Sequence, residues 1–212
     1  YTLSIYNEYK ANTSLIQNPL ISSSSSISSS GLGGIASLAG IGSPGGTSNE
    51  VILAKEIMQS QDFITNFVRK NNLVIPVMAA KGWDSKTDKL VIDNNIYDEV
   101  NKTWIKGEPS DFGIYEKFSE KLSLGEDKKT SIVSLSIEYY SPQIAKLWVE
   151  LYVDEINEHM RNRKLDITYS NLENLESAIQ KPSSKVASES LSRLLYEQQR
   201  TKMLAEATSN YV

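Results

Sequence analysis

The sequence predicts an α+β fold, with an α/β base domain at residues 1–141. A long projecting helix and a returning C-terminal helix follow at residues 142–212. Three observations predict this fold. Apolar and polar residues alternate with a period of two at residues 9–15 and 131–139, which is typical of strands. Helical periodicity separates these two segments, and an unbroken helical pattern of about 40 residues begins at Ser141-Pro142.

The composition is that of a folded chain. Of the 212 residues, 23% are charged and 40% are hydrophobic, and the formal net charge is -4. Such values exclude disordered, collagen-like and disulfide-scaffold proteins. The absence of cysteine excludes thiol nucleophiles and thiolate metal sites. A sequence pI of 5.2 without a basic stripe argues against nucleic acid as a partner.

The first 48 residues predict a strand and then a loop. Within residues 1–17, Tyr9, Ala11, Thr13 and Leu15 share one face. Residues 21–48 are dominated by serine and glycine and predict a flexible loop. Its interleaved apolar residues have a three-residue spacing that suggests a short helical turn: Leu32, Ile35, Leu38 and Ile41.

Residues 49–122 predict short helices separated by turns. One amphipathic stripe runs from Val51 to Met58, and Ser60 caps a second helix that carries Phe63, Ile64, Phe67 and Val68. Pro76 makes 73–80 a strand edge or a loop, 81–89 is expected to be a turn, and 90–93 a short strand. Ser110 caps a helix whose apolar side contains Phe112, Tyr115, Phe118 and Leu122.

The last 82 residues predict one strand and two helices. Residues 131–139 form the strand, and the helix from Pro142 to Lys181 has an apolar first half and a thinner second half marked by Leu165, Leu172, Leu175 and Ile179. We expect the first half to pack on the base and the second half to pack on the returning helix or on other copies. An ordinary helix broken near Asn171 is the alternative. Pro182 ends or kinks the helix, and another helix contains Leu191, Leu194, Leu195 and Gln198.

Motifs for catalysis or cofactor binding are weak. Residues 31–36 match G-x-G-x-x-A, but serines precede them instead of the strand that a dinucleotide site requires. His159 lies one helical turn after Glu155, and without a second histidine or a cysteine this pair lacks enough metal ligands. Asp154 and Glu158 form a similar pair that suits a solvated helix face better than a glycosidase cleft.

A small basic cluster follows these acids and consists of Arg161, Arg163 and Lys164. It would form ion pairs with the preceding acids or bind an anionic sugar or phosphate. The residues therefore predict no catalytic, cofactor or metal site, and the chain is expected not to be an enzyme. They favour a scaffold or an assembly module.

Several segments together resemble the polysaccharide chain-length determinants, the Wzz-type polysaccharide co-polymerases. From Leu191 to Ala205 the chain reads L-x-x-L-L-x-x-Q-x-x-x-x-M-L-A, close to the C-terminal motif of that family. The other segments occur in the family's order: 31–40, 60–63, 77–84, and 136–142 with Ala145, Val149, Val153 and Asn157. The serine-rich run 22–30 departs from the family pattern, which affects only the local order of that loop.

The resemblance implies the periplasmic domain of a bacterial inner-membrane protein, with one membrane helix before residue 1 and one after residue 212. It also implies a membrane-proximal base, a rising coiled-coil-like helix and a ring-like homo-oligomer. The partners would be the membrane O-antigen polymerase and its lipid-linked polysaccharide, and the function would be control of chain length in lipopolysaccharide biosynthesis. Two alternatives from other classes are a periplasmic or surface adhesin-like helical module and a carbohydrate-active enzyme with paired acids.

Overall fold

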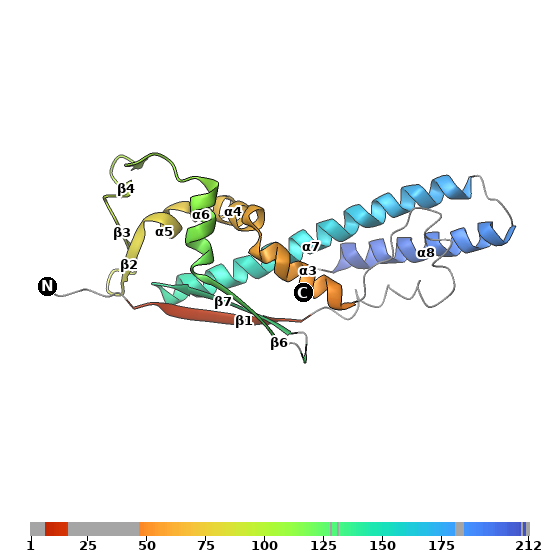
Figure 1. Ribbon diagram of the computed structural model, residues 1–212, viewed down its shortest axis with the longest axis horizontal. Coiled ribbons are helices and arrows are strands. Elements are labelled where there is room, and N and C mark those ends of the chain that lie inside the picture. Colours follow the sequence, from red (N-terminus) through yellow and green to blue (C-terminus); the bar gives the residue numbers. More distant parts are fainter. Residues whose placement is uncertain are drawn as a thin grey trace. The chain divides into compact units, whose positions relative to one another are not determined.

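The computed structural model describes residues 7–16, 47–127, 129–130, 132–180, 185–208 and 210. The fold is α+β, as predicted, and the described residues form six helices and seven strands (Figure 1). The predicted docking turn at 32–41, the G-x-G-x-x-A motif and the break at Pro182 lie outside the described residues.

The chain divides into two compact units. Unit 1 comprises Tyr1–Leu15 and Lys55–Glu155, and unit 2 comprises Ile16–Ala54 and Ile156–Val212. These bounds apply to the described residues within each range. The long helix therefore contributes its first fourteen residues to unit 1 and the rest to unit 2. The domain boundary expected at residue 142 stays a prediction.

Unit 1 contains a three-stranded antiparallel sheet with the order β1-β7-β6. The outer strands are β1 (Tyr9–Leu15) and β6 (Leu122–Asp127), and the central strand is β7 (Ile132–Tyr139). In the register, Leu135 lies opposite both Thr13 and Leu124. The strands expected at residues 9–15 and 131–139 are confirmed. The assignment of Leu122 to a helix was wrong, because this residue begins β6.

Serine caps fix the helices of unit 1 where the sequence predicted them. Ser60 Oγ accepts a hydrogen bond from Phe63 N (3.3 Å) at the start of α4 (Gln61–Lys70). Ser110 Oγ accepts one from Gly113 N (3.2 Å) at the start of α6 (Asp111–Ser119). The preceding helix, α3 (Thr47–Gln59), begins two residues inside the expected serine–glycine loop. The end of that loop was therefore placed too late.

Residues 73–84 correct two expectations. Val74–Ala79 form a six-residue helix, α5, where a strand edge or a loop was expected. Pro76 is its third residue, and the first-turn N–H groups of a helix have no intrahelical partner, so the missing donor costs nothing there. The expected turn at 81–89 is a hairpin of β2 (Ala80–Asp84) and β3 (Lys89–Ile92). A second small hairpin, β4 (Tyr97–Asp98) and β5 (Thr103–Trp104), was not predicted.

An aromatic cluster forms the core of unit 1. The Phe67 and Tyr152 rings meet edge to face with centroids 4.7 Å apart, and the Tyr139 and Trp148 centroids lie 4.2 Å apart. Phe118 contacts the rings of Phe67, Trp148 and Tyr152 and is fully buried. Contacts between offset or tilted rings add stability beyond the area they bury. The sheet, α4, α6 and the first half of the long helix are thereby held as one unit.

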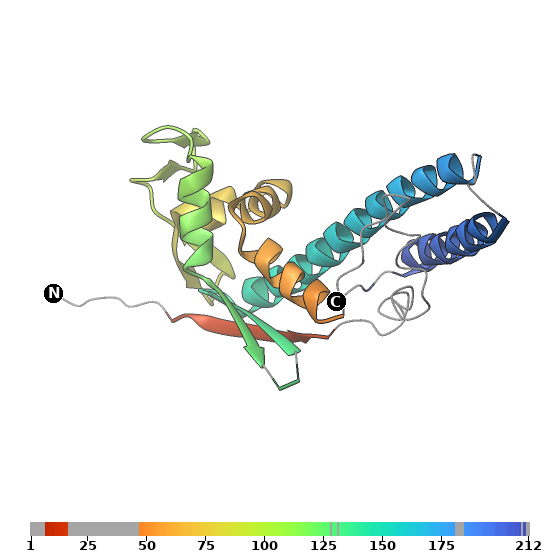
Figure 2. The ribbon, with the colours of Figure 1, turned by 45° about the vertical axis from the view of Figure 1, so that its right-hand side comes forward.

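Unit 2 is built around a helical hairpin of α7 (Pro142–Ile179), from residue 156 onward, and α8 (Lys185–Ala207). The two helices run side by side in both views (Figures 1 and 2). Leu175, Leu191 and Leu194 form a buried cluster, and Ala178, Ile179 and Leu195 pack against it. The unbroken helix and the returning helix are thus confirmed, and the alternative of a break near Asn171 is wrong.

Candidate functional site

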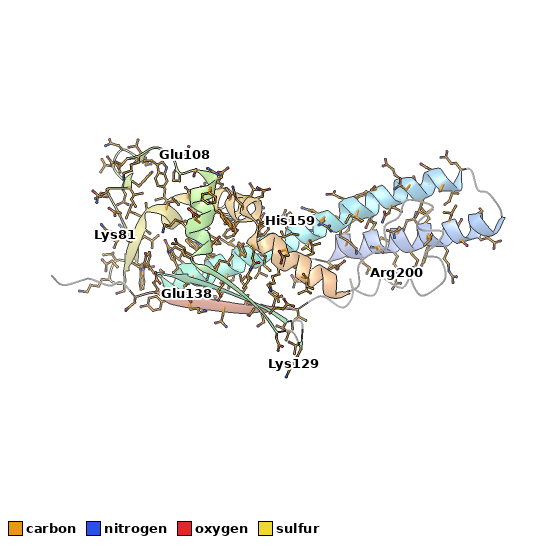
Figure 3. The ribbon with its side chains drawn as sticks, in the orientation of Figure 1. Lys81, Glu108, Lys129, Glu138, His159 and Arg200 are labelled. Atoms are coloured by element: carbon orange, nitrogen blue, oxygen red, sulfur yellow. The ribbon has the colours of Figure 1, made fainter. Side chains whose placement is uncertain are left out.

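The candidate acid–base pair on α7 does not form a catalytic arrangement. Glu155 instead accepts hydrogen bonds at both carboxylate oxygens from Lys70 Nζ of α4, at 3.0 and 2.8 Å. His159 is exposed on α7 (Figure 3). Among the described residues, no group of three or more histidine, cysteine or acidic side chains could hold a metal ion.

The other charged candidates occupy helix surfaces. Asp154 lies with Glu150 along a groove of about 520 Å³ between β1 and the first half of α7. Lys146 Nζ, on the same groove, lies 3.6 Å from a Glu150 carboxylate oxygen. From the basic cluster, Lys164 forms an ion pair with Glu50 of α3 at 3.1 Å. Lys164 is thus used within unit 2 to join α3 to α7.

The clearest candidate for a functional surface lies on α8. Tyr196 and Met203 are large apolar side chains with exposed fractions of 64% and 59%. They are seven residues apart, so they lie on one side of the helix. Arg193 and Arg200 are also exposed and follow the same spacing (Figure 3 labels Arg200). We call Arg193, Tyr196, Arg200 and Met203 the α8 outer face.

Packing within the hairpin explains most of the C-terminal motif but leaves one position unexplained. Leu191, Leu194, Gln198 and Ala205 are buried with exposed fractions of 7% or less. Their 3.6-residue periodicity places them on the inner side of α8. Met203 is the exposed exception. Packing within the hairpin therefore does not account for a methionine at this position.

A second exposed surface lies on α7 and carries two acids, with the exposed Arg163 one turn before the first of them. Asp166 and Glu173 are exposed and seven residues apart, and Ile167 between them has an exposed fraction of 43%. We call Asp166, Ile167 and Glu173 the α7 outer face. It presents two acids at the same spacing as the two arginines of the α8 outer face. At 1.5 Å per residue, both spacings are about 10 Å.

Tyr169 has a different role from the residues of the outer faces. Its hydroxyl lies 3.3 Å from a carboxylate oxygen of Glu206, and Lys202 Nζ lies 4.6 Å from the centre of its ring. Both partners belong to α8, and a cation over an aromatic ring is attracted to it. Tyr169 therefore stabilises the hairpin itself, although 46% of its surface is exposed.

The sequence contained the spacing of both outer faces, but the faces were not predicted. Charged residues at helical spacing usually form a solvated surface. In the sequence, Arg193 and Arg200 therefore look like ordinary exposed residues of a helix. The exposure of Tyr196 and Met203 distinguishes this face, and exposure depends on which side of α8 packs against α7. The seven-residue repeat of tyrosine and methionine was the available clue.

Within the described part of the chain, no helix has the combination of length and apolar character needed to cross a membrane. Comparison of the sequence with protein-family models and with curated proteins found no match. Any functional assignment therefore depends on the residues, on the order of their motifs and on the surfaces described above.

Proposed function

We propose that this chain is the periplasmic domain of a polysaccharide chain-length determinant. It acts as an oligomeric scaffold beside the membrane polymerase that extends O-antigen or a related surface polysaccharide. The observation that carries the proposal is the exposed tyrosine–methionine and arginine face of α8, together with an acidic face on α7 of matching spacing. A scaffold requires surfaces for association and no catalytic centre.

The matching charges favour packing of α8 from one copy on α7 of the next. Arg193 and Arg200 would meet Asp166 and Glu173, and Tyr196 and Met203 would cover Ile167. Exposed ion pairs contribute little each, at most about 1 kcal/mol, so the apolar residues supply affinity and the charges supply register. Two different faces in contact make a heterologous interface, which closes into a ring when the rotation allows it.

Two further features support the family assignment. The motif segments occur in one order along the chain, and the helical hairpin buries the C-terminal motif at Leu191, Leu194, Gln198 and Ala205. In this proposal membrane helices flank the domain on both sides and place it in the periplasm. Those helices would also hold the polymerase and its lipid-linked substrate near the base.

Charge reversal in the full-length membrane protein tests the proposal. Arg193→Glu with Arg200→Glu is expected to abolish self-association measured by cross-linking in membranes, because it places like charges opposite one another. The O-antigen ladder on a gel should then lose its modal length. Adding Asp166→Arg and Glu173→Arg to the same chain should restore both the cross-linked species and the mode.

A matched control reverses two exposed lysines of the β2–β3 hairpin, Lys86→Glu and Lys89→Glu, which have no place in the interface. This control should leave cross-linking and ladder unchanged. Unchanged cross-linking in the arginine variant would contradict the proposed interface. Loss of association with an unchanged ladder would contradict the role in polymer length and favour the adhesin-like helical module.

A further inference from the structure

A pocket of about 360 Å³ in unit 1 lies beside the β4–β5 hairpin and has no lining residue in common with either outer face. Its apolar lining comes from three segments: Met78 of α5, Ile96 and Trp104 of the hairpin, and Pro109 before α6. Its polar lining is Asn95, Lys106 and Glu108, of which Figure 3 labels Glu108. The volume is in the range of pockets that take small ligands.

The hairpin holds Trp104 in a defined position. Trp104 is paired with Tyr97 in the β4–β5 register, and their ring centroids lie 4.9 Å apart. Ile105 N donates a hydrogen bond to Ile96 O at 3.0 Å. The turn is fixed by Asp98, whose carboxylate accepts hydrogen bonds from Val100 N and from the Asn101 backbone and side chain at 2.7–3.0 Å. A ligand would therefore meet a preformed aromatic wall, which lowers the entropic cost of binding.

The polar groups of the pocket have hydrogen-bonding capacity to spare. Asn95 Nδ2 donates to Asp93 Oδ1 at 3.0 Å, whereas Asn95 Oδ1 has no partner among the described residues. Lys106 forms no ion pair with another described residue. Glu108 has a single distant cation, with 3.8 Å between its Oε1 and an Arg69 nitrogen. Relative to the described residues, the pocket thus offers an unpaired acceptor, an unpaired cation and a weakly paired carboxylate beside its apolar lining.

We propose that this pocket binds a sugar residue of the polysaccharide. A pyranose ring has an apolar face of C–H groups that can lie on an indole ring and an edge of hydroxyls that can both donate and accept hydrogen bonds. Asn95, Lys106 and Glu108 supply the complementary acceptor, donor and charged acceptor. A phosphate group fits less well, because a single lysine faces it together with a carboxylate. The choice of a glycan over other small ligands with an apolar face depends on the proposed function.

Saturation-transfer NMR on the 212-residue domain tests the pocket directly. The probes are three trisaccharides that differ in charge and substituent: maltotriose, chitotriose and trigalacturonate. At least one is expected to show transfer to its ring C–H protons, with a dissociation constant near 1 mM, as suits one open pocket. Trp104→Ala should weaken that binding at least about tenfold, and Trp104→Phe, which keeps an aromatic face, should restore most of it.

Two more variants separate pocket binding from loss of folding. Asn95→Ala and Lys106→Ala leave the hairpin pairing intact, and each should reduce binding about threefold or more. Phe112→Ala, an exposed aromatic residue outside the pocket with an exposed fraction of 55%, should have no effect. No transfer to any of the three probes, or a dissociation constant that is unchanged in Trp104→Ala, would overturn the proposal. Because binding is measured on single domains, failure here leaves the association test of the outer faces unaffected.

Discussion

At the scale of single residues, two buried tyrosines couple folding to alkaline pH. The Tyr152 hydroxyl donates a hydrogen bond to Met58 O, and the Tyr139 hydroxyl donates one to Pro76 O at 2.8 Å. Burial raises the pKa of both groups far above their ordinary value of 10.0, because the phenolate form would lose its hydration. The folded chain thus keeps these protons at a pH where the unfolded chain releases them.

The free energy of unfolding should therefore fall as the pH rises above about 10. The stability due to a raised pKa is fully present below the unfolded value and is lost above it, with a limiting slope of about 1.4 kcal/mol per pH unit for each tyrosine. Tyr152→Phe removes one titrating group. Urea unfolding between pH 8 and pH 11 should show a shallower decline for this variant than for the parent chain.

Lys121 acts in the opposite direction, because burial lowers its pKa and stability then rises with pH up to the unfolded value of 10.5. Lys121 is present in both the parent chain and the Tyr152→Phe variant. The difference between their pH slopes is therefore due to Tyr152. Tyr196→Phe, at an exposed tyrosine, is the matched control and should leave the slope unchanged. Identical slopes for Tyr152→Phe and the parent chain would show that Tyr152 does not contribute to the loss of stability at alkaline pH.

The serine cap of α6 gives a second prediction at this scale. Ser110→Ala removes the acceptor for Gly113 N and should lower the free energy of unfolding by about 1 kcal/mol. Ser134→Ala, an exposed strand serine, should change it by less than about 0.5 kcal/mol. Thermal unfolding of the two variants side by side measures the difference, and equal effects would argue against a capping role.

At the scale of elements, the α7–α8 hairpin depends on a small leucine cluster. Leu175 is fully buried and packs with Leu191 and Leu194. Leu175→Ala should cost about 2–3 kcal/mol, because it leaves a cavity in a contact with few other members. Hydrogen exchange of amides in 165–180 and 188–200 should then be faster by about 10–100-fold.

Leu147→Ala, in the same helix but with a side chain that is 50% exposed, is the control for this variant. It should leave exchange in the hairpin unchanged. Equal protection of the hairpin amides in the two variants would show that the leucine cluster does not hold the helices together.

Elements with long periodic patterns were predictable from sequence, and short ones were not. The 38-residue α7 and the eight-residue β7 each repeat their pattern enough times to define the period. The elements α5, β4 and β5 have six, two and two residues, so none of them spans two full periods of its pattern. These elements are set by tertiary contacts, such as the Tyr97–Trp104 ring pair, and those contacts also build the pocket. The same limit therefore hid the candidate sugar site.

At the scale of the whole molecule, α7 belongs to both compact units. Its first fourteen residues supply Trp148 and Tyr152 to the aromatic core of unit 1, and its remainder pairs with α8. The full helix has a length of about 57 Å at 1.5 Å per residue. In a chain-length determinant such a helix admits two mechanisms. The helix acts as a ruler if its own length determines the length of the polymer. It is part of a scaffold if its surfaces determine how the copies associate.

Shortening the hairpin at its tip distinguishes the two mechanisms. Removing residues 174–180, which are the last six residues of α7 and Gln180 after it, and residues 185–191 at the start of α8 shortens the hairpin by about 10 Å. Each deletion is a seven-residue step, so the faces stay aligned to within about 20°. Asp166, Glu173, Arg193 and Arg200 all remain.

In the full-length protein the scaffold mechanism predicts unchanged cross-linking and an unchanged modal length on the gel ladder, because the interface that sets the assembly is kept. The deletion also removes Leu175 and Leu191 of the leucine cluster, so hydrogen exchange in the rest of the hairpin, together with circular dichroism, verifies that α7 and α8 still pack on each other. A modal length that falls with the helix, while cross-linking persists, would contradict the scaffold and favour the ruler.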